Sequence, residues 1–416
     1  MNRGLLLGSG FSYDLGMPLA SELSEVFFGI FDNKKIKILT SALLSQEPFG
    51  KDRPINKKAI TSGLSLLSEH KNSNNYEAFL ADIQKIKNIS QPNQSDMDSY
   101  HYLFEFFYQI VHSILSLYQE ISYEVIYPIN KEWYGGLENF LSEEPTWVFS
   151  LNHDLYLENL AIDLNIPVTY GANGQLEFPI DNLDLNKVIK FELVKRKELN
   201  IENPMFLRKK RGINLVKLHG GLSERLYDDA QILCNLSLKK DSSQKLMNEF
   251  LSLNKMAYYH GDKKVPGGRD ETITNPNGAL DIFSKSMLTG GAKYSINSKD
   301  KEGEEKLKLF HGVLKNLDEL TIIGYGFNDS HINFELNDAL ILNEKLTMRI
   351  VDPIFRNIPD YLQRFESNLR IKRAQCGASH WMSYYRDLKW NERQIEALKE
   401  NNKLREIIKK RVIQKI

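Results

Sequence analysis

Short, uniformly apolar runs alternate with longer amphipathic stretches along this chain. Leu5–Leu7 is the first such run, and TWVFSL at 146–151 and INLVKL at 213–218 follow it after long intervals. Runs of this length without polar alternation are typical of strands that are covered on both faces of a parallel sheet. Towards the C-terminus the runs recur regularly, separated by stretches with helical periodicity. Strands are therefore predicted at 5–8, 146–151, 213–218, 319–324, 346–351 and 369–375.

This alternation predicts an α/β fold built on an open, doubly wound parallel sheet of the Rossmann-like kind. The long interval after the first run is helical in pattern, most clearly at 99–119, where the apolar residues form one broad stripe. Because this interval is too long for a simple crossover, we predict that 31–141 is a helical insertion. The main domain is then expected to consist of residues 1–30 and 142–385.

Two other segments differ from this pattern. Residues 223–305 are polar, and KKVPGGRDETITNPNG at 263–278 predicts a loop. The C-terminal segment 386–416 contains a predicted amphipathic helix at 391–416. Its apolar residues favour either packing on the chain's own sheet or a contact between subunits. They are Ile395, Leu398, Leu404, Ile407, Ile408 and Val412.

Composition narrows the class of protein. The 416 residues include 54 Lys and Arg and 54 Asp and Glu, so the chain has no net charge and is not expected to grip nucleic acid over its whole surface. Cys234 and Cys376 are the only cysteines, which excludes a four-thiolate zinc site within one chain and a disulfide scaffold. No run approaches the ~20 apolar residues that span a bilayer. The start, MNRGLLLGSGFS, predicts a buried strand instead of a signal peptide. A cytoplasmic location is expected.

Candidate chemistry lies where the predicted strands end. The first strand runs into GSGFSYDLGMP at 8–18, in which Gly8 and Gly10 allow a close backbone approach to a phosphate and Ser12 offers a hydroxyl group. Tyr13 stands where a dinucleotide fingerprint requires a third glycine, which argues against a dehydrogenase. A plain turn from strand to helix with Ser12 as N-cap would explain the same residues.

The next two strand ends carry Asn152, His153 and Asp154, and then His219. Helix capping would account for Asn152 or Asp154, and His153 would then be a surface residue. His219 ends an apolar strand before two glycines, where its imidazole can act as a general base near neutral pH, with a reference pKa of about 6.5. A lone histidine is more often a satisfied core residue, but its place at a strand end favours a functional role.

The fourth strand end is IIGYGFNDSHIN at 322–333, a second glycine-bearing turn, and IVDP at 350–353 lies beside it. Asp352 is placed either to accept a hydrogen bond from a ribose hydroxyl or to act as a solvated turn acid before Pro353. The chain has no serine or cysteine in a nucleophile elbow and no His and Asp cluster with metal-ligand spacing. Together the strand ends therefore favour nucleotide cleavage by positioning and base catalysis, without a metal or a covalent intermediate.

In combination these motifs resemble the sirtuin superfamily, which breaks the nicotinamide–ribose bond of nicotinamide adenine dinucleotide (NAD). The family's Asn-x-Asp falls on Asn152 and Asp154, and its strand-terminal His-Gly falls on His219-Gly220. The resemblance covers under half the chain and excludes 31–140, 223–305 and the tail. The glycine-rich opening and the later glycine loop match at Gly8, Gly10, Ser12, Gly16, Pro18, Gly324, Tyr325, Gly326 and Phe327.

The departures from the family pattern are also informative. Deacylase sirtuins carry two cysteine pairs after the histidine, and this chain cannot form that zinc module. Leu19-Ala20-Ser21 replaces the usual Asp-Phe-Arg, Leu151 replaces a glutamine, and Gly326 replaces a serine. What remains is similar to the bacterial sirtuin-like branch of antiphage defence, whose members hydrolyse NAD, and to the effector that partners the HerA ATPase.

The resemblance implies an NAD glycohydrolase that acts in abortive infection as a homo-oligomer assembled with a HerA-type hexameric ATPase. NAD is then the substrate, no zinc is expected, and contact with DNA would fall to the partner. Asn152 would position the ribose and the attacking water, His219 would act as base, and Asp154 would contact the nicotinamide side. An ADP-ribosyltransferase and a non-catalytic NAD or ADP-ribose sensor are the alternatives. The expected binding residues are Gly8, Ser9, Gly10, Ser12, Gly16, Pro18, Gly324, Tyr325, Gly326 and Asp352.

Overall fold

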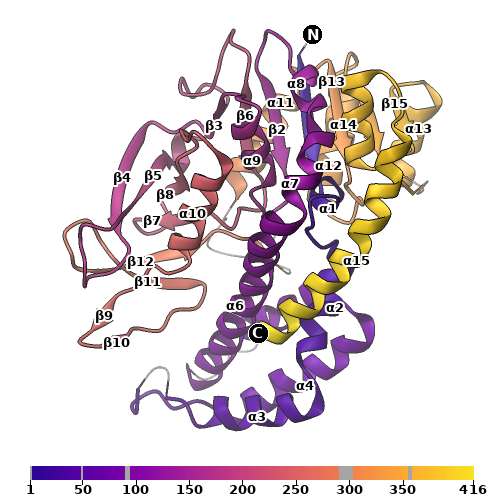
Figure 1. The fold of residues 1–416 in the computed structure, drawn as a ribbon. Helices are drawn as coiled ribbons and strands as arrows, with labels where there is room; N and C mark the ends of the chain where they lie inside the picture. Colours follow the sequence, from indigo (N-terminus) through magenta and orange to yellow (C-terminus); the bar gives the residue numbers. More distant parts are fainter. Residues whose placement is uncertain (1, 48–49, 90–93, 290–302, 355–357) are drawn as a thin grey trace.

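A seven-stranded parallel sheet forms the centre of the computed structural model, which describes residues 2–47, 50–89, 94–289, 303–354 and 358–416 (Figure 1). The strand order is β15-β14-β13-β1-β2-β6-β3, and every neighbouring pair is parallel. The predicted α/β fold with a parallel sheet is confirmed, and all six predicted strands are present. The strands are β1 (Arg3–Leu7), β2 (Thr146–Ser150), β3 (Val168–Thr169), β6 (Ile213–Lys217), β13 (Glu319–Ile323), β14 (Thr347–Val351) and β15 (Ile371–Ala374).

The order of these strands locates a switch point at β1. From β1 the chain builds the sheet outward through β2 and β6, and it later returns to the other side of β1 to add β13, β14 and β15. Ligands of open α/β sheets bind at the carboxyl ends of the strands at such a switch point. The carboxyl ends of β1 and β13 are therefore the place to look for a site.

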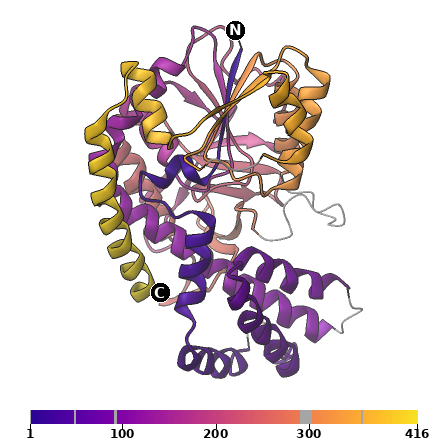
Figure 2. The same cartoon turned by 90° about the vertical axis from the view of Figure 1, so that its right-hand side faces the viewer.

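Helices fill most of the interval between β1 and β2, as the apolar periodicity predicts. Several of them lie beyond the carboxyl edge of the sheet, at the bottom of Figures 1 and 2. Phe27, Phe79 and Phe107 from three helices pack together, with ring centroids 4.8 to 6.0 Å apart. The helices are α1 (Ser9–Tyr13), α2 (Ala20–Ile30), α3 (Asn33–Leu44), α4 (Lys57–Ser73), α5 (Tyr76–Ile89), α6 (Gln94–Val125), α7 (Tyr127–Asn130), η1 (Lys131–Tyr134) and α8 (Gly136–Phe140).

The prediction of a loop at 263–278 holds only in part, because Asp270–Thr274 form a strand of a second, antiparallel sheet of six strands, seen at the left of Figure 1. Its order is β11-β12-β7-β8-β5-β4. Phe178, Phe191 and Phe283 pack together on its buried face, whereas Leu280 and Ile282 are 51% and 53% exposed. The strands are β4 (Gly174–Pro179), β5 (Val188–Lys195), β7 (Glu224–Tyr227), β8 (Ile232–Leu236), β11 (Asp270–Thr274) and β12 (Leu280–Lys285), and β9 (Tyr259–His260) pairs separately with β10 (Lys263–Lys264).

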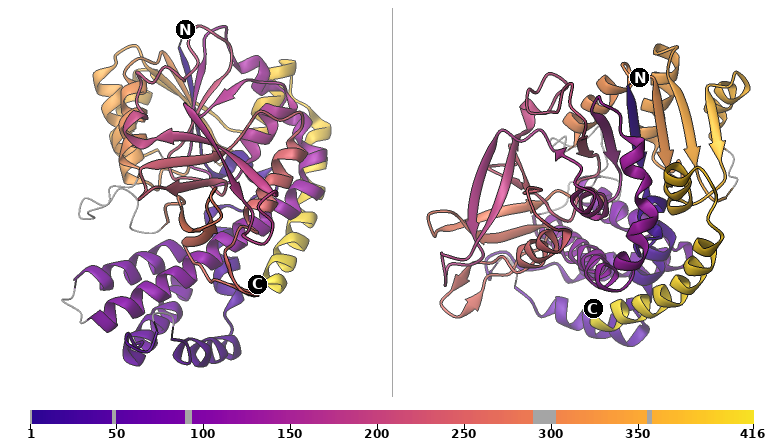
Figure 3. Two further views of the ribbon diagram at one scale, coloured as in Figure 1. Left: turned by 90° about the vertical axis from the view of Figure 1, so that its left-hand side faces the viewer. Right: turned by 45° about the horizontal axis from the view of Figure 1, so that its top comes forward.

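The C-terminal helix packs on its own chain. Helix α15 (Glu392–Lys415) contacts α6 and α2, and it runs along the outside of the molecule in Figures 1 and 3. Ile408 and Val412 are buried, whereas Ile395 and Ile407 remain 47% and 49% exposed. Packing on the chain therefore covers only part of the predicted apolar face. The remaining helices are η2 (Arg196–Glu198), α9 (Tyr156–Asp163), α10 (Ser243–Leu253), α11 (Glu304–Leu314), α12 (Ser330–Leu342), α13 (Asp360–Ser367) and α14 (Ala378–Asp387).

Candidate functional site

A cavity of about 720 Å³ lies at the carboxyl ends of β1, β2, β6 and β13. Its volume falls within the range of about 300–1,000 Å³ that is usual for small-molecule sites. The structure brings most of the predicted site residues to its wall. Those that line it are Gly8, Ser9, Pro18, Asn152, Asp154, His219, Gly324, Tyr325 and Gly326, whereas Gly10, Ser12, Gly16 and Asp352 do not.

Gly8 and Gly10 allow the end of β1 to pack closely against the turn at Gly324. A Cβ on Gly8 would lie 2.5 Å from the carbonyl oxygen of Gly324, and one on Gly10 would lie 2.7 Å from the Cα of Gly324. Gly324 has φ +64°, a left-handed conformation that favours glycine. The N–H of Gly10 donates to the Gly324 carbonyl at 3.0 Å, so it is committed to joining the two strand ends.

Ser12 also differs from its predicted role, because its buried hydroxyl contacts other site residues. Asn152 Nδ2 donates to Ser12 Oγ at 3.1 Å and to the carbonyl oxygen of Gly8 at 2.9 Å. Ser12 also lowers the pKa of Asp154, against the larger effect of burial. Since a carbonyl only accepts, the Asn152 NH₂ group must face Gly8, which leaves the amide oxygen as the polar group that Asn152 can offer to the cavity. Ser12 therefore positions Asn152 and Asp154.

Asp154 lies in an unusual electrostatic environment. Its Oδ1 accepts from the N–H of Tyr156 at 3.0 Å, in the turn that leads into α9, whose N-cap is Leu155. Burial raises the pKa of Asp154, and the nearby Lys217 ammonium opposes this effect. A carboxyl group whose pKa is raised by burial inside a cavity wall is typical of functional sites.

A buried ion pair that the sequence motifs did not predict supports the loop of residues 152–154. Lys217 Nζ lies 2.8 Å from Glu158 Oε1, with side chains 2% and 0% exposed, and it also donates to the backbone oxygen of Asp154. Tyr170 donates its hydroxyl to the same Glu158 oxygen at 3.2 Å. The sequence contains one indication of this pair: the run INLVKL places a lysine inside a largely apolar strand, and a buried charge requires a partner.

His219 lies opposite Asp329, a second residue that the sequence motifs did not predict for the site. Its Nε2 lies 3.0 Å from Asp329 Oδ2, and the two side chains are 6% and 10% exposed. Asp329 Oδ1 caps α12 by accepting from the N–H groups of His331 and Ile332 at 3.1 and 3.3 Å. The carboxylate is therefore fixed by the helix it caps and orients the imidazole. The sequence indication of this role is an aspartate directly before SHINFEL at a strand end. An aspartate at this position also suits an ordinary helix N-cap.

Gly16 and Asp352 lie away from the cavity wall, contrary to their predicted binding roles. A Cβ on Gly16 would lie 2.5 Å from the Cβ of Ser122, so this glycine allows the loop to pack on α6. Asp352 Oδ1 accepts from the N–H of Ile354 at 2.8 Å. The interpretation as a turn acid before Pro353 therefore fits Asp352 better than ribose binding does.

The charges on the cavity wall are unevenly distributed. Its carboxylates are Glu77, Asp154 and Asp329, and its histidines are His153, His219 and His331, while no Lys or Arg is present among the described residues that line it. No described group of three or more His, Cys, Asp or Glu side chains is placed to hold a metal ion. Along the same described ranges, no helix is long and apolar enough to cross a membrane.

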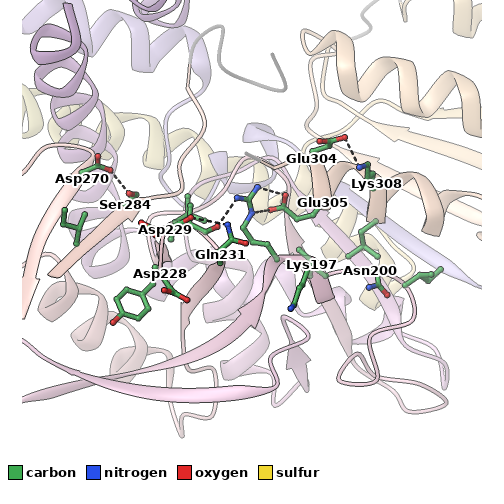
Figure 4. A pocket seen from close by; sticks show the side chains of 18 of the residues that line it. Lys197, Asn200, Asp228, Asp229, Gln231, Asp270, Ser284, Glu304, Glu305 and Lys308 are labelled. Carbon is green, nitrogen blue, oxygen red and sulfur yellow. Dashed lines mark hydrogen bonds and ion pairs between the residues drawn. The ribbon is translucent and has the colours of Figure 1, made fainter. Parts of the chain in front are cut away.

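A larger cavity of about 1,210 Å³ lies between the antiparallel sheet and α11, and its polar wall is drawn in Figure 4. Its side chains largely satisfy one another: Arg196 pairs with Glu305 at 2.9 Å, and Lys308 pairs with Glu304 at 2.9 Å. None of the predicted site residues lines it. The smaller cavity at the switch point is therefore the candidate site. Comparisons of the chain with protein-family models and with curated proteins give no match.

Proposed function

We propose that this chain is an NAD glycohydrolase that cleaves NAD to nicotinamide and ADP-ribose. The observation that supports the proposal is the meeting of Gly8, Asn152, His219 and Gly324 on one cavity wall at the switch point of the sheet. These residues come from four separate strand ends of the chain. The sequence motifs that resemble the sirtuins thus meet where an open α/β sheet binds nucleotides.

The reaction requires little covalent chemistry from the protein. The bond between ribose C1′ and the nicotinamide ring nitrogen breaks, and its electron pair leaves with the ring, which becomes neutral nicotinamide. The ribose passes through an oxocarbenium-like state, and water adds to C1′ while it loses a proton to a base. The protein must therefore hold the ribose, orient a water molecule and accept a proton.

Asn152 and His219 suit these tasks. Asn152 is held through its NH₂ group by Gly8 and Ser12, so its amide oxygen can orient a ribose hydroxyl or a water molecule. The carboxylate of Asp329 lies 3.0 Å from His219 Nε2 and is assigned to orient the imidazole, and His219 is assigned to accept the proton of the water or of a ribose hydroxyl. Asp154 lies beside Asn152 through Ser12 and is assigned to the nicotinamide side.

Phosphate binding must rely on hydrogen bonds more than on fixed cations, because the described wall contains no Lys or Arg. Ser9, the first residue of α1, follows β1 and lines the cavity. The loop with Tyr325 and Gly326 lies beside it. We assign the pyrophosphate to this junction of the two glycine turns.

The test is to incubate the purified protein with NAD and to measure nicotinamide and free ADP-ribose by chromatography. His219→Ala and Asn152→Ala should each abolish nicotinamide release while the proteins melt like the wild type. His260→Ala is the matched control, because His260 is exposed on β9, outside the cavity. Full activity of either site variant would refute the assigned roles. Nicotinamide release without free ADP-ribose would indicate a transferase.

We further propose that the protein acts in the cytoplasm as an antiphage effector, as a homo-oligomer regulated by a HerA-type ATPase. The support is the sequence resemblance together with the half-exposed Ile395 and Ile407 on α15. Light scattering of the full-length protein and of an Ile395→Glu, Ile407→Glu variant tests the contact. A monomeric wild type that does not change when a HerA-type ATPase is added would refute it.

A further inference from the structure

Lys217 lies between the two strand ends that carry the assigned catalytic residues. It is the last residue of β6, two positions before His219. Its ammonium group donates to the backbone oxygen of Asp154, two positions after Asn152 in the loop that follows β2. One side chain thus joins the loop of residues 152–154 to the strand end that presents His219.

A second buried contact fixes the position of this ammonium group. Lys217 Nζ lies 2.8 Å from Glu158 Oε1, and the same oxygen accepts from the Tyr170 hydroxyl at 3.2 Å. The side chains of Lys217 and Glu158 are 2% and 0% exposed, so water cannot readily replace either partner. Because Glu158 belongs to α9 and Tyr170 follows β3, the network connects the ammonium group to two further elements.

The second glycine of KLHGG at 217–221 belongs to the same arrangement. A Cβ on Gly221 would lie 2.9 Å from Lys217 Cδ and 3.3 Å from Lys217 Nζ. Gly220 has a different reason, because its φ is +70° and a Cβ there would lie 2.2 Å from the carbonyl oxygen of Ser286. Gly220 therefore allows the turn after His219, and Gly221 leaves the space that the buried lysine side chain occupies.

We infer that Lys217 is a positioning residue for the cleavage reaction, because its ammonium group fixes the loop that carries Asn152 relative to His219. The inference rests on the proposed function, since it assumes that these two residues act together on one substrate. Another contact also holds the loop, because the N–H of Leu222 donates to the carbonyl oxygen of His153 at 2.8 Å. Loss of the lysine should therefore displace the loop without unfolding it, and a displacement of about 1 Å can lower turnover about 100-fold.

The test requires a paired substitution, because removing one partner of a buried ion pair leaves an unpaired charge and destabilises the fold. Lys217→Met combined with Glu158→Gln removes both charges and keeps an acceptor for the Tyr170 hydroxyl. This double variant should melt near the wild type, since neutral groups of similar volume often replace a buried ion pair without loss of stability. It lacks the donor to the Asp154 carbonyl, so kcat for nicotinamide release should fall about 10–100-fold while KM changes less than about threefold.

A second buried ion pair provides the matched control. Lys306 Nζ lies 2.5 Å from Glu224 Oε1, with side chains 5% and 4% exposed, and neither residue lines the cavity. Lys306→Met combined with Glu224→Gln therefore makes the same two substitutions at a similar depth, away from the site. This control variant should keep kcat within about threefold of the wild type.

Hydrogen exchange reports the position of the loop without requiring cleavage. The N–H of Asn152 donates to the Ser150 hydroxyl at 3.1 Å, and the N–H of Leu155 donates to Gln119 Oε1 at 2.9 Å. Both bonds depend on where the loop lies, so exchange of these two N–H groups should be at least about tenfold faster in the double variant at Lys217. In the control variant the exchange rates should stay within about threefold of the wild type.

The outcomes separate this inference from the proposed function. If the wild type releases nicotinamide but either kcat or loop exchange in the double variant stays within about threefold, the positioning role is refuted and the hydrolase stands. If exchange becomes faster but the wild type does not cleave NAD with or without a HerA-type ATPase, the hydrolase is refuted and the contact of Lys217 with the loop stands. A double variant that does not fold, or a control variant that loses as much turnover, would show that the ion pair serves the fold alone and would overturn the inference.

Discussion

Replacing Arg405 with methionine should loosen the loop that leads from β1 into the candidate site. Arg405 projects from α15, and its guanidinium donates to the carbonyl oxygens of Tyr13 and Met17 at 2.6 and 3.1 Å and to Glu22 Oε2 at 2.8 Å. It also lies 3.6 Å from the centre of the Tyr13 ring. One side chain of the C-terminal helix therefore holds both ends of the stretch from Tyr13 to Glu22.

The size of the effect follows from these contacts. Hydrogen bonds from a charged donor contribute about 1.5–3 kcal/mol each, but water replaces part of what is lost where the partners are accessible. The Arg405 side chain is 10% exposed and that of Glu22 is 31% exposed. We therefore expect Arg405→Met to lower the free energy of unfolding by about 3 kcal/mol, in the range for breaking a largely buried ion pair. Arg405→Lys should lose about half as much, because an ammonium group cannot span the three acceptors.

Urea unfolding followed by circular dichroism measures this loss, and Arg411→Met is the matched control because Arg411 is exposed on the same helix. Pro18, which lines the cavity, belongs to the loop, so KM for NAD should rise with the loss of stability. A free energy of unfolding for Arg405→Met within about 0.5 kcal/mol of that for Arg411→Met would show that the guanidinium does not hold the loop.

Three further predictions concern the site itself. Ser12→Ala should cost about 1 kcal/mol of stability and reduce turnover, because Asn152 loses one of its two amide contacts; unchanged turnover would remove Ser12 from the positioning network. Asp329→Asn should keep the cap of α12, since asparagine caps a helix as well as aspartate does. It should nevertheless lower kcat about 10–100-fold and alter the pH profile of kcat. An unaltered pH profile would argue against the pair with His219. Burial raises the pKa of the Asp154 carboxyl, so the wild type must ionise a buried group as pH rises through that pKa. Asp154→Asn removes this carboxyl, so the stability of the variant relative to the wild type should increase over the same pH range. In urea unfolding across pH, a relative gain that instead appears towards acid pH would contradict the assigned environment.

The sequence by itself determined the parallel sheet and where its chemistry lies. Apolar runs such as TWVFSL and INLVKL have no polar alternation, and only a strand covered on both faces tolerates this. Because parallel strands end at one edge, the polar residues after each run had to approach one another, and Asn152 and His219 do so on one cavity wall. Local patterns carry this information because strand burial and direction follow from the residues of the strand and its connections.

Only the tertiary structure decided which atoms contact each other. The glycines at 8 and 10 indicate a close backbone approach, and only the structure shows that Gly324 is their close neighbour within the protein. The sequence left Asp352 open between a ribose acid and a turn acid, and the fold placed it outside the cavity while it brought Asp329 beside His219. No sequence motif indicated that Glu77 lines the site, because it reaches the cavity wall through the packing of α5 on α2. Pairings across long sequence separations depend on how helices and strands pack in three dimensions, which the periodicity of a single segment does not encode.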